Sequence, residues 1–179
     1  CINSFGTDTM AAWTAHGKID GFFWMIMSAF GIAVTAFVGQ NFGARRYDRI
    51  RQSVRVCLLL SAGTAILLSA AYVGLAGTVL RIFTNDAAVL EIGRQIVHTT
   101  VPFYLTYICA EIMSAAIRGC GEALPPMLMV AGSVCVLRIV WILIMLPIRR
   151  ELSTVLYSYP LSWICVSAVF IVYYLRGGW

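Results

Sequence analysis

Long runs of apolar residues alternate with short charged segments along this chain. Asp, Glu, Lys and Arg are all missing from residues 21–44, 56–80 and 152–175. About 20 consecutive apolar residues are enough to cross the hydrocarbon core of a bilayer. The pattern therefore predicts an all-α fold, a polytopic membrane helical bundle, rather than a soluble domain.

The same pattern predicts five complete transmembrane helices, preceded by the end of a sixth. Gly17, Lys18 and Asp20 indicate a short turn between the truncated helix and the first complete span. The predicted helices cover residues 1–16 (truncated), 19–42, 54–80, 93–118, 124–148 and 152–176. Because Cys1, rather than Met, opens a predicted helix, we expect the chain to be a fragment.

A basic segment follows the first complete span. Its arginines are Arg45, Arg46, Arg49, Arg51 and Arg55, while Tyr47, Ile50 and Val54 share one helical side. This arrangement predicts a short amphipathic helix lying on an anionic leaflet. The positive-inside rule then places this loop, the residues preceding the chain and the C-terminus in the cytoplasm, with the protein multi-pass in the inner (plasma) membrane.

The composition is typical of a membrane protein and limits the classes of partner that we expect. The chain is 60% hydrophobic and 12% charged, whereas soluble domains are about a quarter charged. Membrane orientation already explains the basic loop, so nucleic acid is not an expected partner, whereas the lipid bilayer is. The six cysteines are scattered with no CxxC pair. We interpret them as small apolar residues and expect neither a metal site nor a cofactor.

One span carries a polar stripe. Its members recur at steps of three and four and so share one helical face; they are Thr100, Tyr104, Tyr107, Glu111, Ser114 and Arg118. In hydrocarbon Glu111 would cost roughly 2.5–3.5 kcal/mol. The stripe is therefore expected to face protein or water, surrounded by the other helices.

Glu111 is the leading candidate for ion or substrate binding. A buried carboxylate can be neutralised by a proton, a sodium ion or a cationic compound, so the ligands compete. That competition is what an antiporter requires. The alternative is a structural carboxylate paired permanently with an arginine or with capping backbone groups.

Arg138 is a second charge inside a predicted span. It lies about 21 Å along the helix from Leu124, at the height of Tyr107 or Tyr104. A direct ion pair with Glu111 is one interpretation. Bonding to helix carbonyls or tyrosine hydroxyls is the other.

Further candidates are aromatic and polar residues on other faces and helices. Tyr104, Tyr107 and Trp24 are candidates for an aromatic wall facing a cationic compound, although Trp24, near a predicted helix start, is more typical of an interfacial anchor. Asp8 and Asn3, on the truncated helix, are candidates for the cation site. The face bearing Gly31, Thr35 and Gly39 favours close helix packing.

Several short motifs occur in an order that resembles the multidrug and toxic compound extrusion (MATE) transporters. The GQNxGA motif that closes the eighth helix of that family is matched by Gly39, Gln40, Asn41, Gly43 and Ala44. The RGxG motif that ends the tenth helix is matched by Arg118, Gly119 and Gly121, and Pro125 follows at the usual offset. The RIxW motif resembles Arg138, Ile139 and Trp141, and the end of the seventh helix resembles GTDTMAAW, from Gly6.

The resemblance implies the C-terminal six-helix lobe of a twelve-helix transporter, over residues 1–179. Two such lobes would enclose a central cavity and exchange a sodium ion or a proton for a bulky, often cationic organic drug or toxin. The missing N-terminal lobe would be a partner. Some members carry an acidic cation ligand where this chain has Tyr107, while Glu111 lies where other bacterial members carry glutamate. The coupling ion, including Na⁺ near Glu111, therefore stays open.

Two other functions compete with drug transport as interpretations of this sequence. A flippase for lipid-linked oligosaccharides, related in architecture, would be expected to place more cations in its cavity, and Arg138 is the feature that favours it. An intramembrane enzyme is disfavoured, because the spans contain no paired Asp, no HExxH and no Ser/His arrangement.

Overall fold

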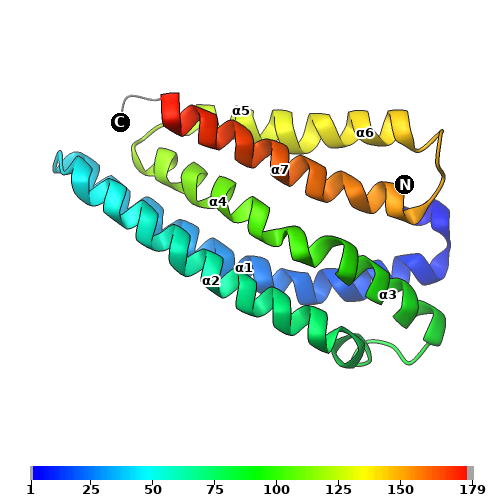
Figure 1. Cartoon of the computed structure of the whole chain (residues 1–179). Helices are drawn as coiled ribbons and strands as arrows, with labels where there is room; N and C mark the ends of the chain where they lie inside the picture. Colours follow the sequence, from blue (N-terminus) through cyan, green and yellow to red (C-terminus); the bar gives the residue numbers. More distant parts are fainter. Residues whose placement is uncertain (1, 177–179) are drawn as a thin grey trace.

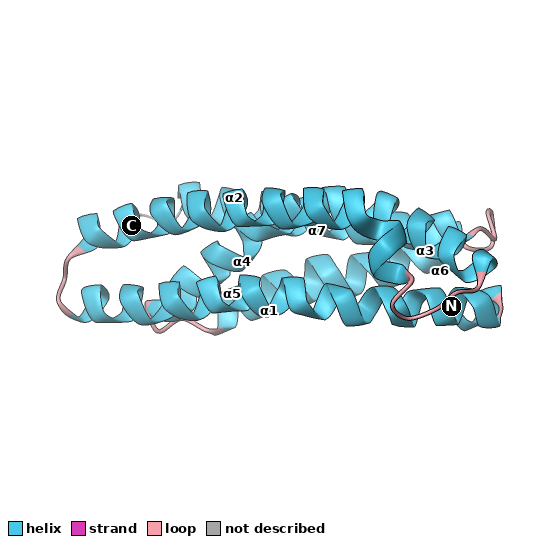
Figure 2. Ribbon diagram, turned by 90° about the horizontal axis from the view of Figure 1, so that it is seen from below, coloured by secondary structure: helices cyan, strands magenta, loops and turns pink. Residues whose placement is uncertain are grey.

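The computed structural model describes residues 2–176, without the side chains of Asn3 and Ser4, and its helices run along one common long axis (Figures 1 and 2). The elements are η1 (Ile2–Phe5), α1 (Thr7–Gly43), α2 (Tyr47–Leu80), α3 (Ala87–Thr100), η2 (Val101–Phe103), α4 (Tyr104–Gly119), α5 (Leu124–Val130), the π-helical η3 (Ala131–Val136), α6 (Leu137–Met145) and α7 (Leu152–Arg176). Because α3 continues through η2 into α4, and α5 through η3 into α6, the described chain has five helical units long and apolar enough to cross a membrane.

The predicted turn at Gly17–Asp20 is wrong, because α1 is one helix of 37 residues. A glycine inside a helix costs only about 1 kcal/mol, and the polar neighbours of Gly17 have partners in the fold. Lys18 lies over the ring of Phe83 at 5.5 Å, and the carboxylate of Asp20 accepts two side-chain hydrogen bonds. The described chain thus has five helices of membrane length, and residues 7–16 belong to the first of them.

The prediction of a separate amphipathic helix after residue 39 is also wrong, although the segment is amphipathic. The turn after α1 is short, and α2 runs unbroken from Tyr47 through 34 residues. Ile50 and Val54 are buried while the five arginines are exposed. The amphipathic segment is therefore the first turns of a membrane-length helix.

The later helices follow the prediction more closely. Asp86 caps α3 by accepting from the backbone N–H of Ala88 at 2.8 Å, so the third unit begins earlier than residue 93. Pro102 lies in the 3-10 turn η2, where the missing N–H is tolerated. The fifth unit has the predicted bounds, 152–176.

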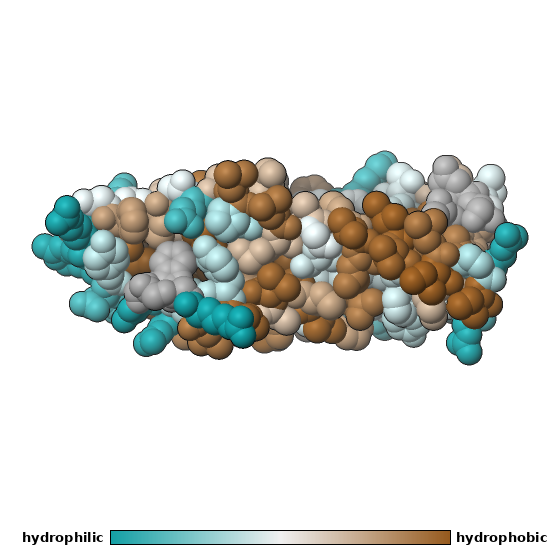
Figure 3. Space-filling model, turned by 90° about the horizontal axis from the view of Figure 1, so that it is seen from above, coloured by the Kyte–Doolittle hydropathy of each residue, from teal (hydrophilic) through white to brown (hydrophobic). Residues whose placement is uncertain are grey.

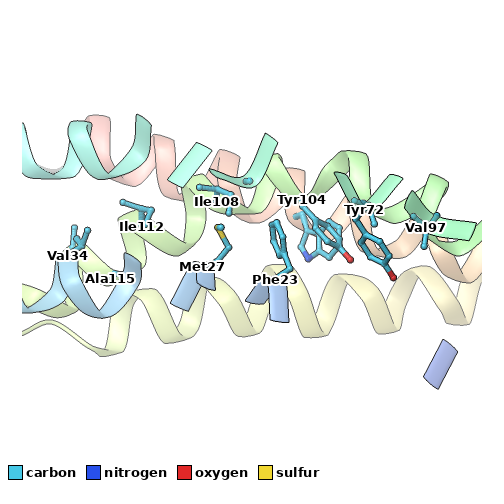
Figure 4. Packing of buried hydrophobic residues seen from close by; sticks show 14 of the residues in the cluster. Phe23, Met27, Val34, Tyr72, Val97, Tyr104, Ile108, Ile112 and Ala115 are labelled. Carbon is cyan, nitrogen blue, oxygen red and sulfur yellow. The ribbon is translucent and has the colours of Figure 1, made fainter. Parts of the chain in front are cut away.

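The core follows the seam between α1, α2 and α4. Figure 4 shows Phe23, Met27 and Val34 of α1 lying along α4, with Ile108 and Ile112 facing them. Helix α4 also contacts α7, which makes it the most enclosed helix of the bundle. The polar stripe of α4 is therefore surrounded by the other helices, as expected.

The outer surface fits a lipid environment. Apolar side chains dominate the middle of the molecule, and hydrophilic side chains gather towards its two ends (Figure 3). In the unit from Leu124 to Met145 the most apolar window has no buried residue. With five helices of membrane length, the chain is a multi-pass membrane protein.

The start of α1 and the end of α7 lie at opposite ends of the bundle (Figure 1). The α1–α2 turn, the α4–α5 loop and the end of α7 share one end. The start of α1 and the 81–86 and 146–151 loops share the other. The C-terminal end of α7 therefore lies on the same side as the arginine-rich α1–α2 turn, as expected, while the cytoplasmic placement of that side and of the residues preceding the chain stays a prediction.

Candidate functional site

A hollow of about 510 Å³ lies between α1, α4, η3–α6 and α7. Its charged side chains are Asp20, Glu111 and Arg138. Six aromatic rings complete much of the wall: Trp13, Trp24, Tyr104, Tyr107, Tyr159 and Trp163. A space of this size, with few polar groups among many rings, is typical of a small-molecule site.

The polar stripe faces this hollow along most of its length. Thr100, Tyr104, Tyr107 and Glu111 all line it. Ser114, one turn further, is buried and accepts a hydrogen bond from Arg118, whose side chain is otherwise exposed. The spacing therefore predicted the orientation of α4 correctly.

Glu111 lies against α1 at a glycine. A β-carbon at Gly31 would lie 3.1 Å from Glu111 Oε1, so the missing side chain makes room for the carboxylate. Glu111 is half-buried and has no hydrogen bond or ion pair within the part of the chain that the structure describes. The nearest cation that acts on it is Arg118, two turns along the same helix.

The GQNFGA motif at the end of α1 and the RGCG motif at the end of α4 meet in one close contact. The end of α1 crosses the end of α4, and a β-carbon at Gly119 would lie 2.8 Å from the carbonyl oxygen of Thr35. A β-carbon at Gly39 would lie 3.3 Å from the carbonyl of Gly119. The Thr35 hydroxyl donates to the carbonyl of Ala115 at 3.0 Å. The expected close packing along Gly31, Thr35 and Gly39 is therefore confirmed.

The turns beyond this contact use the remaining motif residues. Asn41 is buried and donates to the carbonyl of Phe37 at 2.8 Å. Gly121 has a φ of 92°, which favours glycine, and Pro125 lies in the first turn of α5. The GTDTMAAW segment starts α1, so it shares one helix with GQNFGA instead of ending the helix before it.

Asp20 is a site residue that the sequence did not reveal. Its carboxylate accepts one hydrogen bond from Trp24 Nε1 at 2.9 Å and another from the hydroxyl of Tyr104. The sequence predicts a turn at Asp20 because Gly17 and Lys18 precede it. Trp24, four residues later and so on the same face, was the available signal.

The rings around Asp20 form a connected cluster. Tyr104, only 1% exposed, lies 4.6 Å from Phe23, 5.4 Å from Trp24 and 5.5 Å from Trp163, measured between ring centroids. Tyr107 meets Trp24 edge-on at 5.3 Å. The interfacial-anchor interpretation of Trp24 is wrong, because α1 does not start near it and its ring lines the hollow.

A second buried polar pair lies beyond Asp20. His16 is 3% exposed, and its Nδ1 lies 2.9 Å from the hydroxyl of Tyr72 on α2. The two rings stack with centroids 5.8 Å apart. His16 also lines the hollow and thereby links it to α2.

Arg138 reaches the hollow from α6 without contacting Glu111. Its Nη2 donates to the hydroxyl of Ser162 at 2.9 Å, and its guanidinium carbon lies 4.0 Å from the ring centroid of Tyr159. The direct ion pair is therefore not formed. The partners on α7 are a serine hydroxyl and the face of a tyrosine ring, not helix carbonyls or tyrosine hydroxyls.

The other candidates lie away from the hollow or outside what is described. Asp8 is exposed in the first turn of α1, where it accepts from Thr7 at 3.2 Å. The side chain of Asn3 lies outside the described residues. Within residues 2–176 no three His, Cys, Asp or Glu side chains cluster as a metal site, and the five cysteines described there are free thiols.

Comparison with known proteins identifies a family whose members are similar to this chain. The MatE family model matches residues 1–144. Among curated proteins, the probable multidrug resistance protein YoeA of Bacillus subtilis is 29% identical over 128 residues, covering 70% of this chain and 27% of its own length. Multidrug and toxin extrusion protein 2 of Mus musculus is 30% identical over 99 residues, covering 55% and 17%.

Solved structures show the same fold. An outward-facing multidrug resistance MATE family transporter of the MOP superfamily superposes with a TM-score of 0.85 at 16% identity, covering 94% of this chain and 38% of that chain. A MOP superfamily transporter from Pyrococcus furiosus, whose description reports reverse polarity of its binding pocket, gives 0.86 at 16% identity, covering 98% and 38%.

The chain spans about a quarter of the length of YoeA, and less of the mouse protein. The family model nevertheless covers most of the chain, from the first helix into α6. The close contact between the ends of α1 and α4 joins the two motifs that first suggested the resemblance. On this evidence the chain belongs to the MatE family.

Proposed function

We propose that this chain is part of the second lobe of a secondary active transporter that exports organic, often cationic, compounds in exchange for Na⁺ or H⁺. The observation that carries the proposal is Glu111, a carboxylate that opens onto the hollow with no direct basic partner among the described residues. An intramembrane ionisable residue in a cavity is a functional site by default.

Exchange follows from the charge balance of the hollow. A carboxylate in a partly desolvated site needs neutralising, and a proton, a sodium ion or an organic cation can each do so. Only one of them occupies the carboxylate at a time, so binding of the compound displaces the coupling ion. The aromatic rings beside Glu111 supply faces on which an organic cation can lie.

The relatives support export rather than another use of the hollow. YoeA and the mouse protein are described as multidrug resistance and extrusion proteins. The chain is shorter than these proteins, so it supplies one wall of a cavity that the remaining lobe completes. We place the arginine-rich end of α2 in the cytoplasm, because basic residues concentrate there.

Ion-driven transport by the full-length protein in vesicles tests this proposal. Sodium and proton gradients are imposed separately, and export of a fluorescent cation is followed. We expect one gradient to drive export and Glu111→Gln to abolish that stimulation while membrane insertion is kept. The matched control is Glu91→Gln, an exposed carboxylate on α3. Wild-type stimulation in the Glu111→Gln protein contradicts the role, and stimulation by neither gradient contradicts antiport.

The flippase alternative gains no support from the hollow. A pyrophosphate-linked lipid calls for several cations, whereas Arg138 stands there with two carboxylates, Asp20 and Glu111. Enzyme chemistry is likewise not proposed, since the relatives are described as transporters.

A further inference from the structure

A second hollow, the α2–α3 pocket, lies where the end of α2 meets α3 and has a volume of about 430 Å³. It shares no lining residue with the hollow of the candidate site. Its polar side chains are Thr78, Arg81, Arg94 and His98, and no carboxylate lines it. Since the charged groups are all basic, the α2–α3 pocket favours an anionic ligand.

The basic groups of the α2–α3 pocket have donors to spare. Arg81, Arg94 and His98 have exposed side chains, and within the part of the chain that the structure describes they form no hydrogen bond or ion pair. Each guanidinium carries five N–H donors, and an imidazole ring adds one more. Arginine binds carboxylate and phosphate oxygens through pairs of parallel N–H bonds.

Glycines of α2 shape the floor of the pocket. A β-carbon at Gly77 would lie 2.7 Å from Arg94 Nη2 and 3.3 Å from its Nε, so the guanidinium lies directly on the backbone of α2. Gly74 meets nothing within 4 Å and leaves open space beside it. At Gly93 a β-carbon would lie 2.9 Å from Leu80 Cδ1, which shows how closely α2 and α3 approach. The Arg94 side chain is therefore seated across α2, in the same pocket as Arg81.

The face of α2 that bears Arg81 continues as an apolar surface. Arg81, Gly74, Leu67 and Leu60 recur at steps of seven and so share one face. Leu67 is 71% exposed and Leu60 is 58% exposed. From Arg81 to Leu67 the helix rises about 21 Å, which is more than the depth of about 15 Å that one leaflet contributes to the hydrocarbon core. A ligand that matches both parts has an anionic head and a hydrocarbon tail.

We propose that the α2–α3 pocket binds the headgroup phosphate of an anionic phospholipid, whose acyl chain lies along the Leu67 face of α2. Arg81 and Arg94 bind the phosphate oxygens, and His98 donates a further hydrogen bond. Basic pockets between membrane helices are known to bind lipid headgroups in this way. The lipid belongs to the leaflet at the end of the bundle that carries the 81–86 loop. The inference does not depend on which compound the protein exports.

Photo-cross-linking of the full-length protein in liposomes tests the proposal. The liposomes consist of phosphatidylcholine with a small fraction of phosphatidylglycerol that carries a diazirine in one acyl chain, and cross-linked residues are identified by mass spectrometry. We expect cross-links at residues 67–74. Phosphatidylcholine with the same photoreactive chain should give about tenfold fewer, because its ammonium group cancels the phosphate charge that the arginines bind.

A pair of double variants separates the pocket from general surface charge. Arg81→Gln/Arg94→Gln should lower the phosphatidylglycerol cross-links at residues 67–74 about tenfold, to the level of phosphatidylcholine. Arg149→Gln/Arg150→Gln removes the same charge from an exposed loop at the same end of the bundle and should leave them unchanged. Cross-links to the lipid-facing unit from Leu124 to Met145 serve as the internal reference for insertion.

Gly77→Ala tests the geometry while both arginines are kept. The new methyl group would lie 2.7 Å from Arg94 Nη2, so the guanidinium must leave its seat on α2. We expect the phosphatidylglycerol cross-links at residues 67–74 to fall several-fold. Gly21→Ala, at an exposed position with nothing within 4 Å, is the matched control.

Three results would overturn the proposal: equal cross-linking by the two lipids in the wild type, equal loss in the two double variants, or loss of the cross-links when glycerol 3-phosphate is added in millimolar excess. The last result would assign the pocket to a soluble phosphate instead of a lipid. If the Arg81→Gln/Arg94→Gln protein fails to insert, the comparison of the two lipids on the wild type and the Gly77→Ala variant decide. Export is not measured, so the antiport proposal stands or falls separately.

Discussion

The hydroxyl of Tyr104 donates a hydrogen bond to the carboxylate of Asp20, joining α4 to α1 across 84 positions of sequence. Asp20 lies in the apolar part of a membrane-length helix, where a charge needs a partner. Tyr104 supplies one partner from the polar stripe, and Trp24 supplies the other from the next turn of α1. The bond therefore fixes the axial register of the two helices that carry the carboxylates of the hollow.

Tyr104→Phe should destabilise the protein by about 1–3 kcal/mol, because the ring stays packed while the half-buried carboxylate of Asp20 loses a donor. Thermal unfolding of the purified full-length protein measures the change. Tyr157→Phe, on the exposed surface of α7, is the matched control. An unaltered unfolding midpoint in Tyr104→Phe would show that the bond contributes nothing.

Gly31→Ala should impair ion-coupled transport without unfolding the protein. The new methyl group would lie 3.1 Å from Glu111 Oε1, tighter than ordinary van der Waals contact, so the flexible carboxylate must move. We expect a several-fold loss of ion-stimulated export. Gly63→Ala, which meets nothing within 4 Å, should transport normally. Equal transport by both variants would argue against a role for the carboxylate position.

Gly119→Ala should be more damaging to stability than Gly31→Ala. Its β-carbon would lie 2.8 Å from the Thr35 carbonyl oxygen and 2.8 Å from Val38 Cβ, so backbone must shift. Overpacking of this kind typically costs about 1–3 kcal/mol, and thermal unfolding reports it. Gly74→Ala, in open space on α2, is the control. A Gly119→Ala protein as stable as that control would contradict the close crossing of α1 and α4.

Much of the architecture was predictable because lipid imposes a simple rule. Helix length and apolar continuity gave α7 its bounds, and steps of three and four placed the polar stripe of α4 towards the protein interior. Glu111 and Arg138 stood out because isolated charges inside apolar runs are costly. These features depend on local sequence, so sequence suffices to find them.

The predictions that the structure contradicts share a different cause. Gly17, Lys18 and Asp20 have the composition of a turn. No neighbouring residue in the sequence indicates that Tyr104, on another helix, donates a hydrogen bond to Asp20. His16 has its partner, Tyr72, on α2. For Arg138 the sequence suggests Glu111, helix carbonyls or tyrosine hydroxyls as partners, whereas the fold offers the Ser162 hydroxyl and the Tyr159 ring face from α7. The role of such residues depends on partners that are distant in sequence, and the spacing of residues within one helix does not predict those partners.

The wall that bears Arg138 is attached mainly to one neighbour. The segment α5–η3–α6 packs chiefly on α7 and only slightly on α4, and Trp141 Nε1 ties it there through the carbonyl of Thr154 at 3.0 Å. The segment contributes no residue to the core cluster along the Phe23–Ile112 seam, so that seam does not depend on where the segment lies. The width of the hollow on this side is thus set chiefly by how one helical segment packs on one neighbour.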